Sequence, residues 1–189
     1  MITDWGAHHI DILHWALGID REGPTAVENF ESDGFGKDAL LDWAGEYSFD
    51  LVYASGFRAH ISNKYPNGLR FKGSKGEVFV KRGSLERPEH LRKWNEKRDL
   101  GPNEIHLYKP ANGHCHESDF IDGIFENRPI ATDCEIGHRS ISACHIANIC
   151  ERIGARSLSW DPKAERFTGA DAERANALLK VPYANGWAV

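Results

Sequence analysis

The feature that most constrains the fold is an alternation of apolar and polar side chains within the stretch from Pro24 to Arg82. A period of two is typical of strands with one buried face. The apolar positions of the clearest run are Trp43, Tyr47, Phe49 and Leu51. Further strand-like runs lie near 52–61, 69–72 and 77–82, and turn-forming segments occupy 66–68 and 73–76. Strands joined by short turns pair antiparallel, so we expect a meander with one covered face and one available face.

Helical patterns flank these strands. The first begins at Thr3 or Asp4, either of which can cap it, and ends at Gly18. We expect further helices near 116–126, 134–153 and 171–180, a short strand at 157–160, and a charged, proline-broken loop at 85–110. The mixture of elements predicts an α+β protein.

Composition excludes several classes of protein. The 189 residues suit one domain or two very small ones, and the net charge of −5 argues against a nucleic-acid binder. No apolar run approaches the roughly 20 residues of a membrane span, and no export signal follows Met1. The cysteines, at 115, 134, 144 and 150, form no C-x-x-C pair. We therefore expect a cytoplasmic protein with reduced thiols, no nucleic-acid partner and no membrane contact.

The strongest chemical candidate is the pair Asp4 and His8. Residues four apart share a helix face, so the carboxylate can meet the imidazole and fix its tautomer. Such a pair can take a proton from a hydroxyl and return it. The alternative is a capping aspartate beside a solvated histidine.

Metal binding is a second reading of the same helix. His8, His9, Asp11 and His14 supply donors, and His114, Cys115 and His116 supply more. However, His8 and His9 point about 100° apart on a helix, and no H-E-x-x-H spacing exists. We therefore assign no metal site.

Other candidate residues lie on the strands and the long helix. Arg58 and His60 are two apart on a predicted strand, where they can bind a polyol or carboxylate or simply face water. His138 can face a site or pack beside one. The letters G-x-G-x-x-A at 34–39 match a dinucleotide loop, but the residues at 29–33 are too polar for a buried parallel strand, so we expect a loop.

Five ordered segments suggest a family. D-x-G-x-H-x-x-D at 4–11 and F-x-G-x-x-G at 71–76 are followed by segments at 116–124, 135–140 and 158–162. Together they resemble the C-terminal region of the Gfo/Idh/MocA family of NAD(P)-dependent oxidoreductases. The resemblance implies a large open-faced, mainly antiparallel β-sheet with helices packed on one face, a two-layer sandwich.

The resemblance also implies a function. It makes His8 the acid–base group for a substrate hydroxyl and Asp4 its partner. Beside them, His9, Arg58, His60 and His138 are our candidate substrate-binding residues. The substrate would be a sugar or polyol. NAD or NADP would be bound by a Rossmann domain, which residues 1–189 lack. We therefore expect a single C-terminal, substrate-side domain, inactive alone and without a tightly bound cofactor, that resembles a fragment of a longer enzyme.

Partners follow from the expected sheet. An exposed face rich in Trp43, Tyr47 and Phe49 would be a large apolar patch, which marks a subunit contact. The resemblance agrees, since sheets of this family pack face to face. We therefore expect a homo-oligomer through the sheet face. Two alternatives remain open: a non-enzymatic interaction module built on that sheet, and a histidine-rich metal-binding protein.

Overall fold

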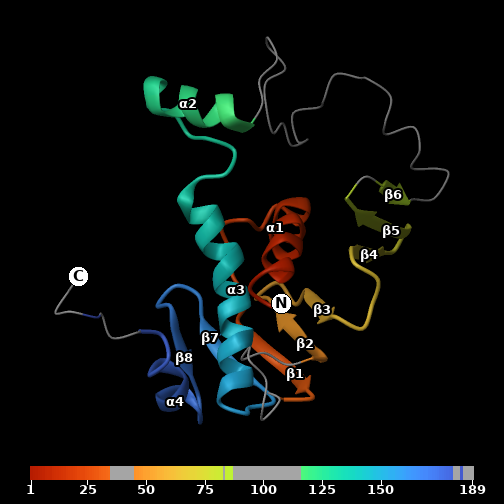
Figure 1. Cartoon of the computed structure of the whole chain (residues 1–189), viewed down its shortest axis with the longest axis vertical. Helices are drawn as coiled ribbons and strands as arrows, with labels where there is room; N and C mark the ends of the chain where they lie inside the picture. The colour runs from red at the N-terminus through yellow and green to blue at the C-terminus, as the bar shows by residue number, and fades with distance from the viewer. Residues whose placement is uncertain (35–44, 83, 87–115, 181–183, 185–189) are drawn as a thin grey trace. The chain divides into compact units, whose positions relative to one another are not determined.

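The computed structural model describes residues 1–34, 45–82, 84–86, 116–180 and 184. The chain divides into two compact units, one made of Met1–Asn67 with His138–Val189 and the other of Gly68–Gly137. Figure 1 shows the elements of both units in chain order by colour. Each unit is described by itself below.

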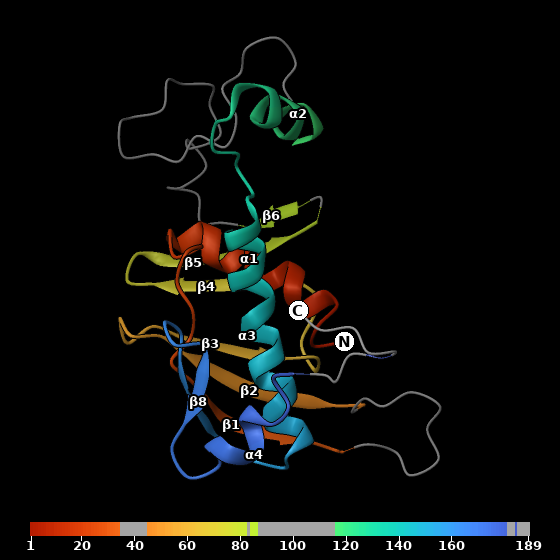
Figure 2. The same cartoon turned by 90° about the vertical axis from the view of Figure 1, so that its left-hand side faces the viewer.

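The first unit is built on a five-stranded sheet with the order β3-β2-β1-β7-β8, and all of its ladders are antiparallel. Its strands are β1 (Ala26–Ser32), β2 (Tyr47–Val52), β3 (Arg58–Ser62), β7 (Leu158–Asp161) and β8 (Arg166–Thr168). The helices are α1 (Trp5–Leu17), α4 (Ala172–Asn176) and the part of α3 (Cys134–Arg152) from His138 onward. Figure 2 shows α3 beside the strands in a second view. The expected open-faced, antiparallel α+β architecture is confirmed.

One face of the sheet forms the core with the helices. Along β2, buried Tyr47, Phe49 and Leu51 alternate with half-buried residues, as a period of two requires. They share one apolar cluster with residues of α1 and α3, including Ile10, Ala143, Cys144 and Ala147. The small side chains of α3 let that helix lie close to the strands. The result is a sheet layer covered on one face by a helix layer.

The prediction that Tyr47 and Phe49 form an apolar patch on the open face is wrong. Tyr47 is 6% exposed and Phe49 is 0% exposed, because both side chains point toward the helix layer. Trp43 lies outside the described residues. The open face instead carries polar side chains, since the residues that alternate with the buried ones along β2 include Ser48 and Asp50.

Strand β1 is more polar than a buried strand normally is. The polar residues at 29–33 argue against a buried parallel strand, and the structure agrees. Most of this segment belongs to an antiparallel strand between β2 and β7. The register shifts between Glu28 and Glu31, and Asn29 has a φ of 53°. This bulge lets polar residues occupy an interior strand. Of the expected loop at 34–39, only Gly34 lies within the described residues.

Helix α1 ends as the sequence predicts. Gly18 adopts a φ of 67°, and the N–H of Ile19 donates to the carbonyl of His14 at 2.9 Å. At the other end Asp4 occupies the N-cap position without a side-chain capping bond. The inward face carries Ile10, Leu13 and His14, which are buried, so α1 is part of the helix layer.

The second unit holds a separate three-stranded antiparallel sheet of β4 (Leu69–Gly73), β5 (Gly76–Lys81) and β6 (Ser84–Glu86). The expected hairpin turn at 73–76 is confirmed, with Gly73 opposite Gly76. The expectation of a single meander is wrong, because β3 and β4 belong to different sheets. The turn-forming segment at 66–68 separates them, and Gly68 has a φ of 146°.

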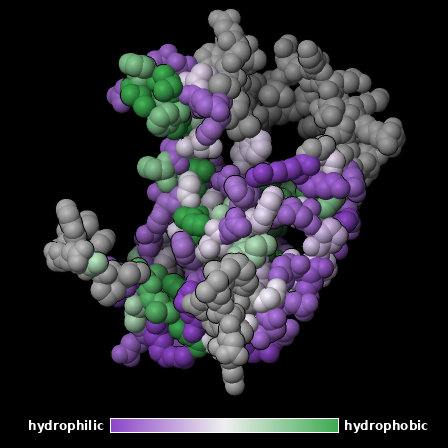
Figure 3. All heavy atoms as spheres, in the orientation of Figure 1, coloured by the Kyte–Doolittle hydropathy of each residue, from purple (hydrophilic) through white to green (hydrophobic). Residues whose placement is uncertain are grey.

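Helix α2 (His116–Glu126) also belongs to the second unit and begins and ends where expected. The carboxylate of Asp119 accepts hydrogen bonds from Arg128 Nη1 at 2.8 Å and from the Ala131 N–H at 2.9 Å. These bonds lower the pKa of Asp119. Gly123 packs against Ile130, so the segment after the helix folds back along it. Figure 3 shows hydrophobic side chains on α2, of which the exposed ones are Phe120, Ile121, Ile124 and Phe125.

Candidate functional site

The two residues expected to be catalytic lie at the start of α1, Asp4 at the N-cap position and His8 within the helix. Asp4 and His8 are both exposed, and His8 lies on the opposite side of the helix from buried Ile10 and His14. No hydrogen bond joins the two side chains. The imidazole of His8 instead makes an edge-type ring contact with Trp5, with ring centroids 5.8 Å apart, and the His9 ring centroid lies 6.0 Å from that of the same indole. The imidazole of His8 is therefore open to a ligand arriving from outside.

Two other residues of the same motif lie on the side of α1 that faces α3. A Cβ added at Gly6 would lie 3.7 Å from Cys144 Sγ, an ordinary van der Waals distance. Asp11 Oδ1 accepts a hydrogen bond of 2.9 Å from the hydroxyl of Ser140. In D-x-G-x-H-x-x-D, the second aspartate thus ties α1 to α3, while the first aspartate and the histidine are exposed.

Buried His14 anchors the other end of α1. Its Nε2 lies 2.7 Å from the hydroxyl of Tyr53, and its Nδ1 is buried without a hydrogen-bond partner. Burial lowers the pKa of His14 against the opposing pull of Asp11 and Asp20, and burial raises the pKa of Tyr53. The ring is therefore a neutral anchor within the core rather than a group that can meet a substrate.

Metal donors do not gather in the described part of the chain. Among those residues no three or more histidine, cysteine, aspartate or glutamate side chains are placed to hold one ion. His8 and His14 point to opposite sides of α1, outward and inward respectively. His114 and Cys115 lie outside the described residues.

Arg58 and His60 form a charged cluster around Asp50. The Asp50 carboxylate accepts hydrogen bonds from Asn29 Nδ2 at 2.8 Å, His60 Nδ1 at 2.7 Å and Arg58 Nη2 at 3.4 Å. Burial alone would raise the pKa of Asp50, but these bonds outweigh it and lower that pKa. Arg58 also pairs with Glu28 at 2.6 Å. The cluster spans three adjacent strands.

This cluster lies on the opposite face of the sheet from α1. His60 is the register partner of Asp50, which alternates along β2 with Phe49 and Leu51 of the core. Because those two residues point toward the helix layer, Arg58 and His60 point away from it. The structure therefore does not bring them together with His8, and one small substrate cannot touch both.

His138 is engaged in a local contact near the start of α3. Its Nε2 lies 2.6 Å from Glu165 Oε1, and neighbouring Arg139 donates to the Pro162 carbonyl at 2.7 Å. Both partners belong to the turn between β7 and β8. The pair thus ties α3 to that hairpin, while a role of His138 in substrate binding stays a prediction.

Sequence reasoning missed two residues that position the site. Tyr53 reads as an ordinary strand aromatic, and Ser140 as one of several small residues of α3. The available signal for Ser140 was its place in the family-like segment at 135–140. No pattern in the chain indicates that Tyr53 meets a histidine 39 residues away.

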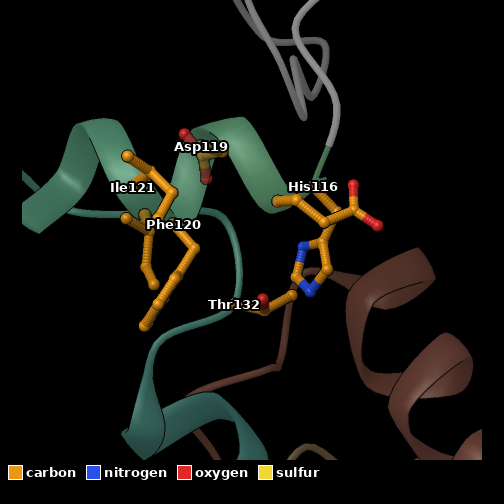
Figure 4. Close-up of a pocket in the computed structure, with 7 residues that line it drawn as sticks. His116, Asp119, Phe120, Ile121 and Thr132 are labelled. Atoms are coloured by element: carbon orange, nitrogen blue, oxygen red, sulfur yellow. The ribbon is translucent and has the colours of Figure 1, made fainter.

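A hollow of about 330 Å³ lies along α2 in the second unit. Figure 4 shows His116 and Thr132 on one side of it and Phe120 and Ile121 on the other. Asp119 also lines it but is held by Arg128 and Ala131. None of the residues expected to act on a substrate lines this hollow.

Comparison with known proteins gives one result. The family model described as "Oxidoreductase family, C-terminal alpha/beta domain" matches residues 1–189, the whole chain. No curated protein and no solved structure matches. In the described part of the chain, none of the helices combines the length and apolar character needed to cross a lipid bilayer.

Proposed function

Because the chain belongs to the family of Gfo/Idh/MocA oxidoreductase C-terminal domains, we propose that it is the substrate-side domain of an NAD(P)-dependent oxidoreductase acting on sugars or polyols. The family match supports the oxidoreductase class. The substrate class and the division of labour between domains belong to the proposal.

The observation that carries the proposal is the outward position of His8 on a fixed helix. Asp11 ties α1 to α3 through Ser140, and Ile10 and His14 of α1 are buried, so the exposed imidazole stands on a rigid support. A histidine is the side chain best suited to exchange a proton near neutral pH. We assign His8 the role of taking the proton from a substrate hydroxyl, with Asp4 turning toward the ring to orient it once substrate is bound.

The described residues do not fit a nicotinamide dinucleotide. Dinucleotide-binding folds need parallel strands joined through a helix, with the phosphates at the N-terminus of that helix. Every strand pair in the described part of the chain is antiparallel. A separate cofactor-binding domain, on the same polypeptide or another, would therefore supply NAD or NADP.

Reconstituted turnover tests the proposal. The chain is produced together with a nicotinamide-binding domain of this family, and reduced cofactor is followed by absorbance with a panel of sugars and polyols. We expect turnover with at least one of them, and a loss of roughly tenfold or more in kcat for Asp4→Asn. Glu22→Gln, an exposed carboxylate beyond α1, is the matched control. A folded complex without turnover on the whole panel would contradict the proposal.

The open face of the sheet favours a second role as a subunit contact. Arg58 and His60 keep side-chain exposures of 46% and 52%, and the helices of the first unit pack on the other face of the sheet. We propose that a second copy packs against this charged cluster rather than on an apolar patch. Light scattering at micromolar concentration should then give a dimer or larger species, and Arg58→Glu should shift it toward monomer. A monomer for the parent chain would refute this contact.

A further inference from the structure

We propose that Ser140 is a positioning residue for His8 and that it acts through Asp11. The inference rests on the proposed function only in giving His8 a chemical role. Its structural content is a hydrogen bond of 2.9 Å between two helices, joining residues 129 positions apart in the chain.

Asp11 follows His8 by three residues on α1 and is half-buried on the side of the helix that meets α3. Side chains three apart on a helix are neighbours, so the negative charge of Asp11 can lie against the imidazole or turn away from it. Which of these occurs depends on what holds the carboxylate. In the structure Ser140 Oγ donates to Oδ1, which turns Asp11 toward α3.

Ser140 is well placed to hold that carboxylate. The residue is 4% exposed, so its hydroxyl has little access to water. A buried hydroxyl that loses its acceptor is costly, and a charged acceptor gives the stronger bond. The bond is therefore maintained while α1 and α3 stay packed.

The other contacts of α1 do different work. Ile10 of α1 belongs to the same core cluster as Cys144, and His14 meets Tyr53, so both hold the helix independently of Ser140. Neither contact touches a carboxylate beside His8. Loss of one of them loosens the helix, whereas loss of the Ser140 hydroxyl releases a charge next to the imidazole. The two effects can be separated by experiment.

The test is the NMR signal of the His8 ring in the 189-residue chain, assigned by its disappearance in His8→Gln. Ser140→Ala should move this cross-peak by more than its line width at neutral pH, because Asp11 turns toward the ring. Cys144→Ala, one turn further along α3 on the same helix contact, is the matched control. It should lower the unfolding temperature and leave the His8 signal in place.

A second background keeps the proposal open to refutation. Asp11→Asn preserves the shape of the side chain and an oxygen acceptor but removes the charge. If Ser140 acts through Asp11, then Ser140→Ala should barely move the His8 signal in the Asp11→Asn background. An unmoved signal in the single Ser140→Ala variant would overturn the proposal. So would an equal shift in the Cys144→Ala variant or in the Asp11→Asn background.

Kinetics of the reconstituted enzyme separate this inference from the proposed function. We expect Ser140→Ala to lower kcat by roughly tenfold with KM nearly unchanged. The released carboxylate of Asp11 would pull the His8 ring out of its reacting position, while the contacts that bind substrate remain. If the parent complex shows no turnover but the NMR shift occurs, the proposed function fails and the positioning role stands. If turnover is normal in Ser140→Ala, the positioning role fails.

Discussion

The contact between His14 and Tyr53 makes a quantitative prediction about stability. Tyr53→Phe removes the only hydrogen bond of the buried imidazole, whose Nδ1 already lacks a partner. Both ring nitrogens would then be buried without partners. Tyr53 is 1% exposed, so little water can enter to replace its hydroxyl.

The size of the effect follows from the cost of an unsatisfied buried polar group. Leaving one buried group without its partner costs about 1–3 kcal/mol. In a chain of 150–250 residues each kcal/mol shifts the unfolding temperature by about 2–4 °C. Tyr53→Phe should therefore lower that temperature by about 2–12 °C. Tyr65→Phe, at a tyrosine that is 64% exposed, is the matched control and should change it by less than about 1 °C.

The same pair makes stability depend on pH. Burial lowers the pKa of His14 below its ordinary value of 6.5. As pH falls through about 6.5 the unfolded imidazole binds a proton while the folded one stays neutral. Stability is therefore retained above that pH and lost below it, by up to about 1.4 kcal/mol per pH unit until the folded ring also protonates.

Urea unfolding at pH 8 and pH 5.5 measures this dependence. His14→Gln places an amide nitrogen near Nε2, so it can still meet Tyr53 but does not titrate. The loss of stability between the two pH values should be smaller in His14→Gln than in the parent chain, by at most about 1.4 kcal/mol. The reasoning is refuted if the two chains lose equal stability on acidification, or if Tyr53→Phe melts with the parent chain.

Three further predictions concern packing and thiol chemistry. Phe49→Ala should destabilise the first unit by about 3–5 kcal/mol in urea unfolding, because the ring is 0% exposed in the core. Gly123→Ala should reduce hydrogen-exchange protection of α2, since its new Cβ would collide with Ile130; unchanged protection would contradict this. Burial raises the pKa values of Cys144 and Cys150 to about 12. Peptide mapping after alkylation at pH 8 should therefore show them unmodified until the chain unfolds, while the exposed thiol at the start of α3 reacts.

The sequence predicts local structure better than it predicts the arrangement of sheets. The bounds of α2 and the end of α1 at Gly18 follow from turn and helix signals that act within a few residues. The burial of Phe49 beneath the helices does not follow from such local signals. Alternation shows that one face of a strand is buried, but it does not show which set of side chains meets the helices. The separation of β3 from β4 depends on long-range packing that no local pattern encodes.

The candidate site shows the same limit. The spacing of Asp4 and His8 on α1 could be read from the chain, and the structure places both at the surface. The spacing of Arg58 and His60 predicted a shared face, which is confirmed by their common contact with Asp50. The sequence could not show that this face of the sheet points away from His8, because that depends on the side of the sheet on which α1 and α3 pack.

The most direct test of the account compares His8, on the outer side of α1, with His60, on the sheet face that points away from the helix layer. In the reconstituted enzyme His8→Ala should lower kcat/KM by roughly 10²–10⁴-fold, the range typical of a lost acid–base group. His60→Ala should leave kcat/KM within about twofold at a protein concentration where the oligomeric state of both variants matches the parent. Activity that survives the loss of His8, or that falls equally without His60, would contradict the assignment of the site to the outer face of α1.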